Sequence, residues 1–164
     1  MNSGRHYKEM LVINCIDKNY SSRKNQAIKY IVIHDTANKR KGANAYNHYL
    51  YFGSAHRNSS AHFFVDDSNI LQILPISYAA WHVGDGKRGI ITNENSIGVE
   101  MCINEDSDRN MTKKNMIRLI HYLLLMCKLP ATSVVRHFDA SGKICPGSMS
   151  QNNWQEWKEF IKSI

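Results

Sequence analysis

Short apolar runs rich in β-branched residues alternate with amphipathic stretches along this chain, and that alternation favours an α/β architecture. KYIVIHDT (29–36), SIGVEMCI (96–103) and SVVRH (133–137) are predicted strands. AHFFVDDSNILQILP (61–75) is a predicted hairpin, because a turn-forming segment separates its two apolar runs. The pattern predicts a central mixed β-sheet flanked by helices.

Helical periodicity marks the segments between and after these strands. Segment 42–53 places apolar side chains on one face and ends at Gly53, a predicted C-cap. Segment 112–130 is predicted to begin with Thr112 as its N-cap and to stop at Pro130. A last helix is predicted from four apolar positions, Trp154, Trp157, Ile161 and Ile164. These helices complete the expected α/β fold.

Length and composition predict a single domain over residues 1–164. The chain has no internal repeat, low-complexity tract or linker. No apolar run reaches the roughly 18 to 20 residues of a membrane helix, and the first 27 residues are too polar for a signal peptide. The 4 cysteines lack short paired spacings, which favours free thiols or metal ligands. We therefore expect synthesis in the cytoplasm without a signal peptide, and no membrane partner.

The charge of the chain indicates a polyanionic partner. A formal net charge of +7 and a pI near 9.3 suit either nucleic acid or an anionic polymer such as a bacterial cell wall. The basic residues are scattered, and the chain lacks the signature of a helix-turn-helix, an RNA-recognition domain or a zinc finger. We expect no nucleic-acid function.

One Gly- and Pro-punctuated segment, RHFDASGKICPG (136–147), contains two candidate metal ligands, His137 and Cys145. Histidine and thiolate are natural zinc ligands, and catalytic sites commonly use three protein ligands with a fourth position left for water. His34, at the end of a predicted buried strand, is the best third candidate. Each of the three, taken alone, is more often structural. The absence of C-x-x-C and H-x-x-x-H pairs favours an open, catalytic site if metal binds.

Glu100 is a carboxylate inside an apolar strand. Strand alternation places it on the same face as Gly98 and Cys102, over a face with empty space. Desolvation there should raise its pKa and suit it to be a general base. The alternative is a carboxylate paired with a buried Arg or Lys.

Five ordered motifs carry a family resemblance: IVIHDTAN, SAHFFVDD, AAWHVG, NSIGVE and RHFDASGKICPG. In order and spacing they resemble the zinc-dependent N-acetylmuramoyl-L-alanine amidases of the type 2 family. That family includes phage lysins, bacterial autolysins and a cytosolic recycling amidase, and it shares its fold with the peptidoglycan recognition proteins. The resemblance runs from about Ser22 to the C-terminal helix.

The resemblance implies roles for individual residues. It implies one zinc ion held by His34, His137 and Cys145. Lys143 matches a lysine that steadies the oxyanion, and Glu100 matches the glutamate used as base. Some phage members have a tyrosine where this chain has Ala61, and they lack the glutamate, so this chain resembles the glutamate-using branch.

Expected substrate contacts come from the same motifs. The candidates are His62, Trp81, His82 and Asn95. The loop 84–95 is a candidate binding segment for the stem peptide. For His62, the alternative to substrate contact is a role in supporting the residues of the site. For Trp81, and for Tyr46 and Tyr49 in segment 42–53, ordinary core packing is the competing interpretation.

The resemblance implies a zinc-dependent peptidoglycan hydrolase that cleaves between N-acetylmuramic acid and L-alanine. Its partner is peptidoglycan and its place of action is the bacterial cell wall, as a phage endolysin or an autolysin. Two alternatives stay open: a non-catalytic peptidoglycan-binding module, and a zinc peptidase that cuts within the stem peptide. Many lysins of this family also carry a separate wall-binding domain after the amidase, and the sequence leaves that arrangement open.

Overall fold

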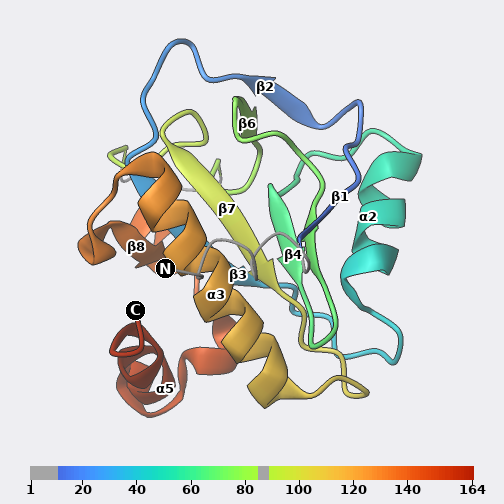
Figure 1. Cartoon of the computed structure of the whole chain (residues 1–164), viewed down its shortest axis with the longest axis vertical. Helices are drawn as coiled ribbons and strands as arrows, with labels where there is room; N and C mark the ends of the chain where they lie inside the picture. Colours follow the sequence, from blue (N-terminus) through green and yellow to red (C-terminus); the bar gives the residue numbers. More distant parts are fainter. Residues whose placement is uncertain (1–10, 85–88) are drawn as a thin grey trace, which may run out of the picture.

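A six-stranded mixed sheet forms the centre of the protein. The computed structural model describes residues 11–84 and 89–164 (Figure 1). The strands of the sheet are β1 (Leu11–Ile13), β3 (Tyr30–Asp35), β4 (Phe63–Val65), β5 (Ile70–Gln72), β7 (Ser96–Met101) and β8 (Val134–Arg136). Their order is β1-β5-β4-β7-β3-β8, and every neighbouring pair is parallel except the β4–β5 hairpin. The expected mixed sheet is confirmed.

Three short strands were missed by the pattern. Besides β1, these are β2 (Tyr20–Ser22) and β6 (Tyr78–Ala80), which form a separate antiparallel pair. Each contains only three residues, and β1 and β2 are partly exposed, so neither presents an apolar run or a clear alternation. Their positions come from pairing with strands elsewhere in the chain, as β1 pairs with β5.

Helices cover both faces of the sheet. They are α2 (Ala45–Ser54), α3 (Arg109–Cys127), α4 (His137–Ser141) and α5 (Gln151–Ile161), with 3₁₀ turns η1 (Ala131–Ser133) and η2 (Gly147–Met149). In Figure 1, α3 crosses in front of the strands, while α2 lies at the right-hand edge. The helices predicted in the regions of α2, α3 and α5 are therefore present, whereas the short helix α4 was not predicted.

Two predicted helix ends were wrong. The N-cap of α3 is Asp108, whose carboxylate accepts hydrogen bonds from the backbone N–H groups of Asn110 and Met111. Thr112 lies in the first turn, where its hydroxyl donates to the Asp108 carbonyl. Helix α2 runs past Gly53 and is capped by Ala55. Asp108 and Thr112 are both good cap residues by type, so composition alone does not choose between them.

Alternation along the central strands separates a core face from a second face. Side chains of one set, Ile31, Ile33, Phe63, Val65, Ile97, Val99 and Met101, pack against α3 and α5. The intervening residues of β3, β4 and β7 face the other way, where Val32 of β3 packs with Ala140 of α4 and Phe64 of β4 packs with Ala45 of α2. The residues with candidate chemistry therefore lie on this second face.

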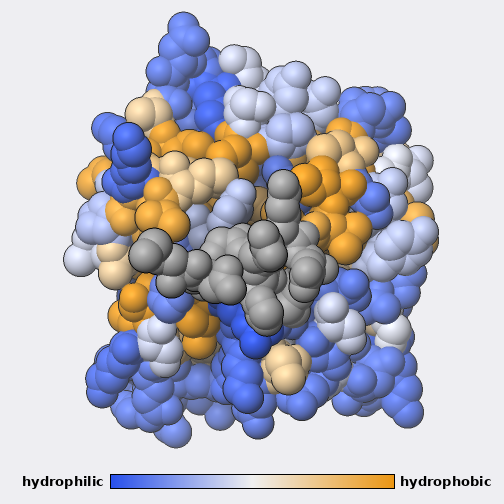
Figure 2. All heavy atoms as spheres, in the orientation of Figure 1, coloured by the Kyte–Doolittle hydropathy of each residue, from blue (hydrophilic) through white to orange (hydrophobic). Residues whose placement is uncertain are grey.

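The α3 side of the molecule has a mixed surface. Figure 2 shows apolar residues in separate patches over the upper half and the left of this face, and mostly hydrophilic residues along its lower edge. No helix within residues 11–84 and 89–164 combines the length and apolar character needed to cross a membrane.

Candidate active site

Three candidate metal ligands converge at one edge of the sheet. His34 is near the end of β3, and His137 follows directly after β8. These strands are parallel neighbours with Ile33 opposite Arg136, so their carboxyl ends bring the two histidines to the same level. Cys145 joins them, and the ligand atoms of the three buried residues all lie within 4.8 Å of one another.

The loop that carries Cys145 folds back over α4. Gly142 ends the helix in the left-handed region, with φ 87°, which glycine adopts without steric cost. The backbone N–H of Phe138 then donates to the Cys145 carbonyl at 3.0 Å. This return of the chain matches the expectation from the glycine in the segment.

The three residues fit a zinc ion. Nδ1 of His34 lies 3.8 Å from Sγ of Cys145. Zinc bonds of about 2.0–2.1 Å to nitrogen and 2.3 Å to sulfur would separate two tetrahedral ligands by about 3.6 Å. Burial, reinforced by the charge of Glu100, raises the pKa of the Cys145 thiol to about 12. A thiolate at this position therefore needs a cation beside it.

A cavity of about 650 Å³ opens over these ligands. Its lining includes the predicted catalytic pair, Glu100 and Lys143, and the predicted substrate residues Trp81 and His82. Asp35, which the sequence analysis did not single out, also lines it. The structure thus brings together most of the predicted site residues around one space large enough for a small ligand.

Glu100 faces this cavity from β7, directly opposite His34 on β3. Burial raises the pKa of Glu100 to about 8, Asp35 acts in the same direction, and Lys143 opposes them. The net direction is upward, so the attraction of Lys143 does not outweigh the effect of burial. Among the described residues, Oε2 of Glu100 has no hydrogen-bond partner. A buried acceptor in this position is suited to a water molecule or a substrate proton.

Trp81 and His82 occupy different depths of the cavity. Trp81 is half-buried, and its indole N–H donates to the Ser21 hydroxyl at 3.2 Å. His82 is mostly buried, and its Nδ1 lies 3.0 Å from Nε2 of His34. Burial, together with the neighbouring His34, holds the pKa of His82 well below its ordinary value, so the ring is neutral. Trp81 is better placed to meet a ligand, whereas His82 contacts a candidate metal ligand.

His62 and Asn95 lie outside the cavity lining. His62 is fully buried: its Nδ1 accepts from the Gly98 N–H, and its Nε2 lies 3.0 Å from the Tyr78 carbonyl. Asn95 closes a turn by accepting from the Thr92 N–H and donating to the Ile90 carbonyl. Their burial supports a structural role for each and gives no support to direct substrate contact.

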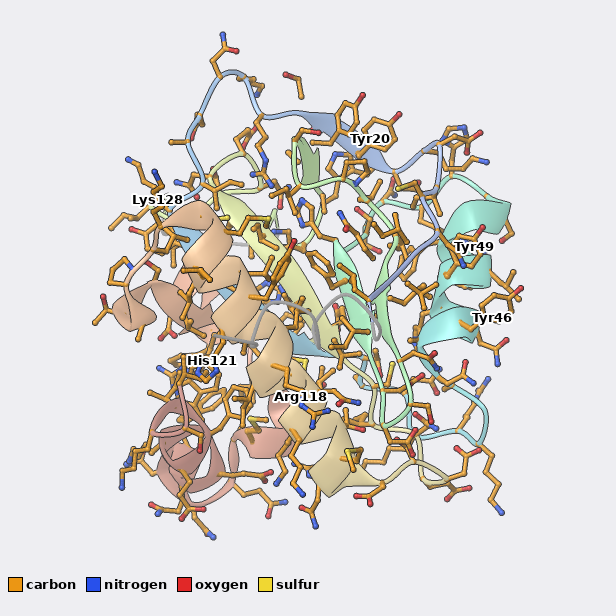
Figure 3. All side chains as sticks on the ribbon, viewed as in Figure 1. Tyr20, Tyr46, Tyr49, Arg118, His121 and Lys128 are labelled. Carbon is orange, nitrogen blue, oxygen red and sulfur yellow. The ribbon has the colours of Figure 1, made fainter. Side chains whose placement is uncertain are left out.

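Two further expectations concern the rim of the site. The predicted stem-peptide loop 84–95 includes residues 85–88, which lie outside the described residues. Tyr46 and Tyr49 both project from α2 (Figure 3). Tyr49 packs against the core on that face, whereas Tyr46 is half exposed. Neither tyrosine lines the cavity.

Two residues that support the site were missed. Asn93 holds the chain at His82, because its side-chain oxygen accepts from the N–H groups of both His82 and Val83. Ser96, fully buried on β7, lies 3.1 Å from Nε2 of His82. Neither residue type is unusual in its sequence context. Their roles depend on strand register and loop geometry.

We expect His62 to make the protein less stable as the solution is acidified. Burial lowers the pKa of His62 to about 3, with Arg23 acting in the same direction and a hydrogen bond to Tyr78 opposing it. The unfolded chain has a histidine pKa of about 6.5, so between these values only the unfolded state binds this proton. The free energy of unfolding should therefore fall by about 2 kcal/mol between pH 7 and pH 5 from this residue.

Urea denaturation of the wild type and His62→Gln at both pH values, under the same chelator, measures this contribution. Glutamine does not titrate, so the variant should lose about 2 kcal/mol less than the wild type on acidification. Equal losses in the two proteins would show that His62 does not carry the effect.

Comparison with known proteins identifies relatives over most of the chain. A family model described as N-acetylmuramoyl-L-alanine amidase matches residues 24–148. The amidase CwlH of Bacillus subtilis (strain 168) is 40% identical over 135 residues, which cover 82% of this chain and 52% of that protein. XlyA of the same organism is 38% identical over 132 residues, covering 80% and 43%. The chain thus spans about half the length of the curated relatives it matches.

Solved structures agree with these matches. The catalytic domain of XlyA has a TM-score of 0.82 and 34% identity, and the match covers 94% of this chain and 98% of that one. The structure of PlyL has a TM-score of 0.76 and 29% identity, with coverage of 93% and 94%. Sequence and fold agree, and the chain belongs to the N-acetylmuramoyl-L-alanine amidase family identified by this family model.

Proposed function

We propose that this chain is a zinc-dependent peptidoglycan hydrolase that cleaves the amide bond between N-acetylmuramic acid and L-alanine. The observation that carries the proposal is the His34, His137 and Cys145 cluster at a cavity that also contains the buried Glu100. The names of CwlH and XlyA, both N-acetylmuramoyl-L-alanine amidases, support the bond assignment.

The proposed chemistry divides the reaction among few groups. A bound zinc ion supplies a water molecule whose pKa is lowered to about 7 and a Lewis acid for the carbonyl oxygen. Glu100 would accept a proton from the water that attacks the lactyl carbonyl. It would then deliver the proton to the departing L-alanine nitrogen, so that one carboxylate both accepts and returns the proton. Burial suits Glu100 to hold the proton between the two transfers.

Lys143 is proposed to stabilise the oxyanion that forms on the attacked carbonyl. It lines the same cavity as Glu100 and influences its pKa, so its charge acts within the site. Lys143→Ala should reduce kcat by about 100- to 1,000-fold, because one donor to the developing charge is lost. Zinc content should stay at the wild-type level, since Lys143 is not a proposed ligand.

Lys114→Ala removes an exposed lysine from α3 and is the matched control for charge. It should retain wild-type kcat in the same assay. If Lys143→Ala keeps kcat within threefold of the wild type, the oxyanion role is wrong.

The proposed partner is peptidoglycan, and the proposed place of action is the bacterial cell wall. The net charge of +7 would concentrate the protein on an anionic wall. The relatives are longer than this chain, so a wall-binding domain elsewhere in the full protein is compatible with the proposal. The solved structure of a mutant endolysin from Bacillus subtilis, which is 34% identical to this chain, supports an endolysin or autolysin setting.

Digestion of purified peptidoglycan, with and without a chelator, tests the proposed function. The proposal predicts new N-terminal L-alanine, no new reducing sugar, and loss of both activity and new ends on chelation. New ends at another peptide bond would support the zinc peptidase instead. Binding without any new ends would make the chain a recognition module.

A further inference from the structure

A buried series of hydrogen bonds links His34, through His82 and Ser96, to the backbone carbonyl of Thr92. Nε2 of His34 lies 3.0 Å from Nδ1 of His82, and Nε2 of His82 lies 3.1 Å from the Ser96 hydroxyl. That hydroxyl donates to the Thr92 carbonyl. The three side chains are 2%, 8% and 0% exposed, so solvent contributes little to their hydrogen bonding.

The direction of these hydrogen bonds can be assigned from the Thr92 end. The Thr92 carbonyl only accepts, so the Ser96 hydroxyl uses its proton there and must accept from Nε2–H of His82. With the ring proton on Nε2, Nδ1 of His82 is an acceptor, and it receives Nε2–H of His34. His34 is left with an unprotonated Nδ1, the atom that lies 3.8 Å from Sγ of Cys145.

Packing holds the His82 ring in this orientation. A Cβ atom at Gly98 would lie 2.7 Å from Cγ of His82, so the absence of a side chain there lets the ring lie close against β7. On the backbone side, Asn93 accepts hydrogen bonds from the N–H groups of His82 and Val83, each at 2.9 Å. The ring is therefore positioned from both sides.

We propose that His82 and Ser96 are positioning residues. They hold His34 in the tautomer with an unprotonated Nδ1, and thereby set the zinc affinity of the site. The inference rests on the proposed zinc function. Partners of a metal-bound histidine fix its tautomer and orientation, and their loss typically costs about 10- to 100-fold in metal affinity. In this arrangement His82 acts through His34 and Ser96 acts through His82.

Zinc affinity measured by competition with a chromophoric chelator tests the proposal. His82→Ala removes the acceptor for His34 and should weaken zinc binding by about 10- to 100-fold. His82→Asn places an amide oxygen near the position of Nδ1 and should recover much of that loss. Ser96→Ala keeps the His82 ring but releases its tautomer, and should weaken binding by about tenfold. Ser133→Ala, at a buried serine in η1, is the matched control and should bind zinc as the wild type does.

A second readout reports the tautomer directly. In metal-free wild-type protein, ¹⁵N NMR of the histidine rings should show His34 protonated on Nε2 alone. In His82→Ala the same ring should show a mixture of tautomers, a change that general destabilisation of a folded protein would not produce. Because Ser96→Ala removes only one oxygen, it keeps the test valid if His82→Ala folds poorly.

The outcomes separate this inference from the proposed function. If the wild type binds zinc and the His82 and Ser96 variants bind it within twofold of the wild type, the positioning role is wrong. It is also wrong if His34 keeps a single tautomer in both variants, or if Ser133→Ala loses as much affinity as Ser96→Ala. If the wild type itself binds no zinc, the proposed function fails, and the tautomer measurement alone decides whether His82 and Ser96 orient His34.

Discussion

Cys145→Ser should lose its zinc and, with it, more than about 1,000-fold of the hydrolytic rate. The thiolate is the anionic ligand of the proposed His, His, Cys set, and a serine hydroxyl at the same position stays neutral and binds zinc weakly. Without the metal, the site has no means of generating hydroxide at neutral pH. Zinc content by mass spectrometry and the rate of peptidoglycan digestion measure the two effects on one preparation.

The matched control is Cys127→Ser, which changes a half-buried thiol on α3 that does not line the cavity. This variant should keep one zinc ion and the wild-type rate. Stoichiometric zinc in Cys145→Ser would remove Cys145 from the metal site. Loss of zinc in both variants would point to a general effect of the substitution.

Glu100→Gln should keep its zinc and lose about 100- to 10,000-fold in kcat. Glutamine preserves the size of the side chain and its place opposite His34, but it cannot take up and return a proton. The size of the loss follows from removing one positioned general base. Retained zinc with a lost rate separates this effect from that of Cys145→Ser.

Glu105→Gln is the control for this substitution, since Glu105 is an exposed carboxylate in the loop that follows β7. It should digest peptidoglycan at the wild-type rate. If Glu100→Gln keeps kcat within tenfold of the wild type, another group accepts the proton.

The metal cluster and Glu100 were accessible from the sequence because each leaves a local signal. His34 ends a β-branched run, Cys145 lies in a loop with turn residues, and Glu100 interrupts an apolar strand. The structure adds what no local pattern contains, namely that β3 and β8 are parallel neighbours. That pairing is why His34 and His137, far apart in the sequence, meet at one sheet edge.

Features that depend on strand register, or on the choice between two residues of similar capping ability, could not be predicted from the sequence. Ser96 reaches His82 only because β7 places it on the same face as Gly98. His62 belongs to a recognisable motif, yet both nitrogens of its ring contact backbone groups of neighbouring strands, and the ring does not line the cavity. The N-cap of α3 is Asp108 and not Thr112, because the helix begins one turn before its apolar pattern.

Hydrolysis of a synthetic N-acetylmuramoyl-L-alanyl peptide in H₂¹⁸O, followed by mass spectrometry, identifies the carbonyl that water attacks. The proposed reaction predicts one ¹⁸O atom in the carboxylate of N-acetylmuramic acid, an unlabelled peptide with a free L-alanine amino group, and no products after chelation. Label in a carboxylate within the peptide would contradict the proposed function, because it would place the attacked carbonyl in the stem peptide and make the chain a zinc peptidase.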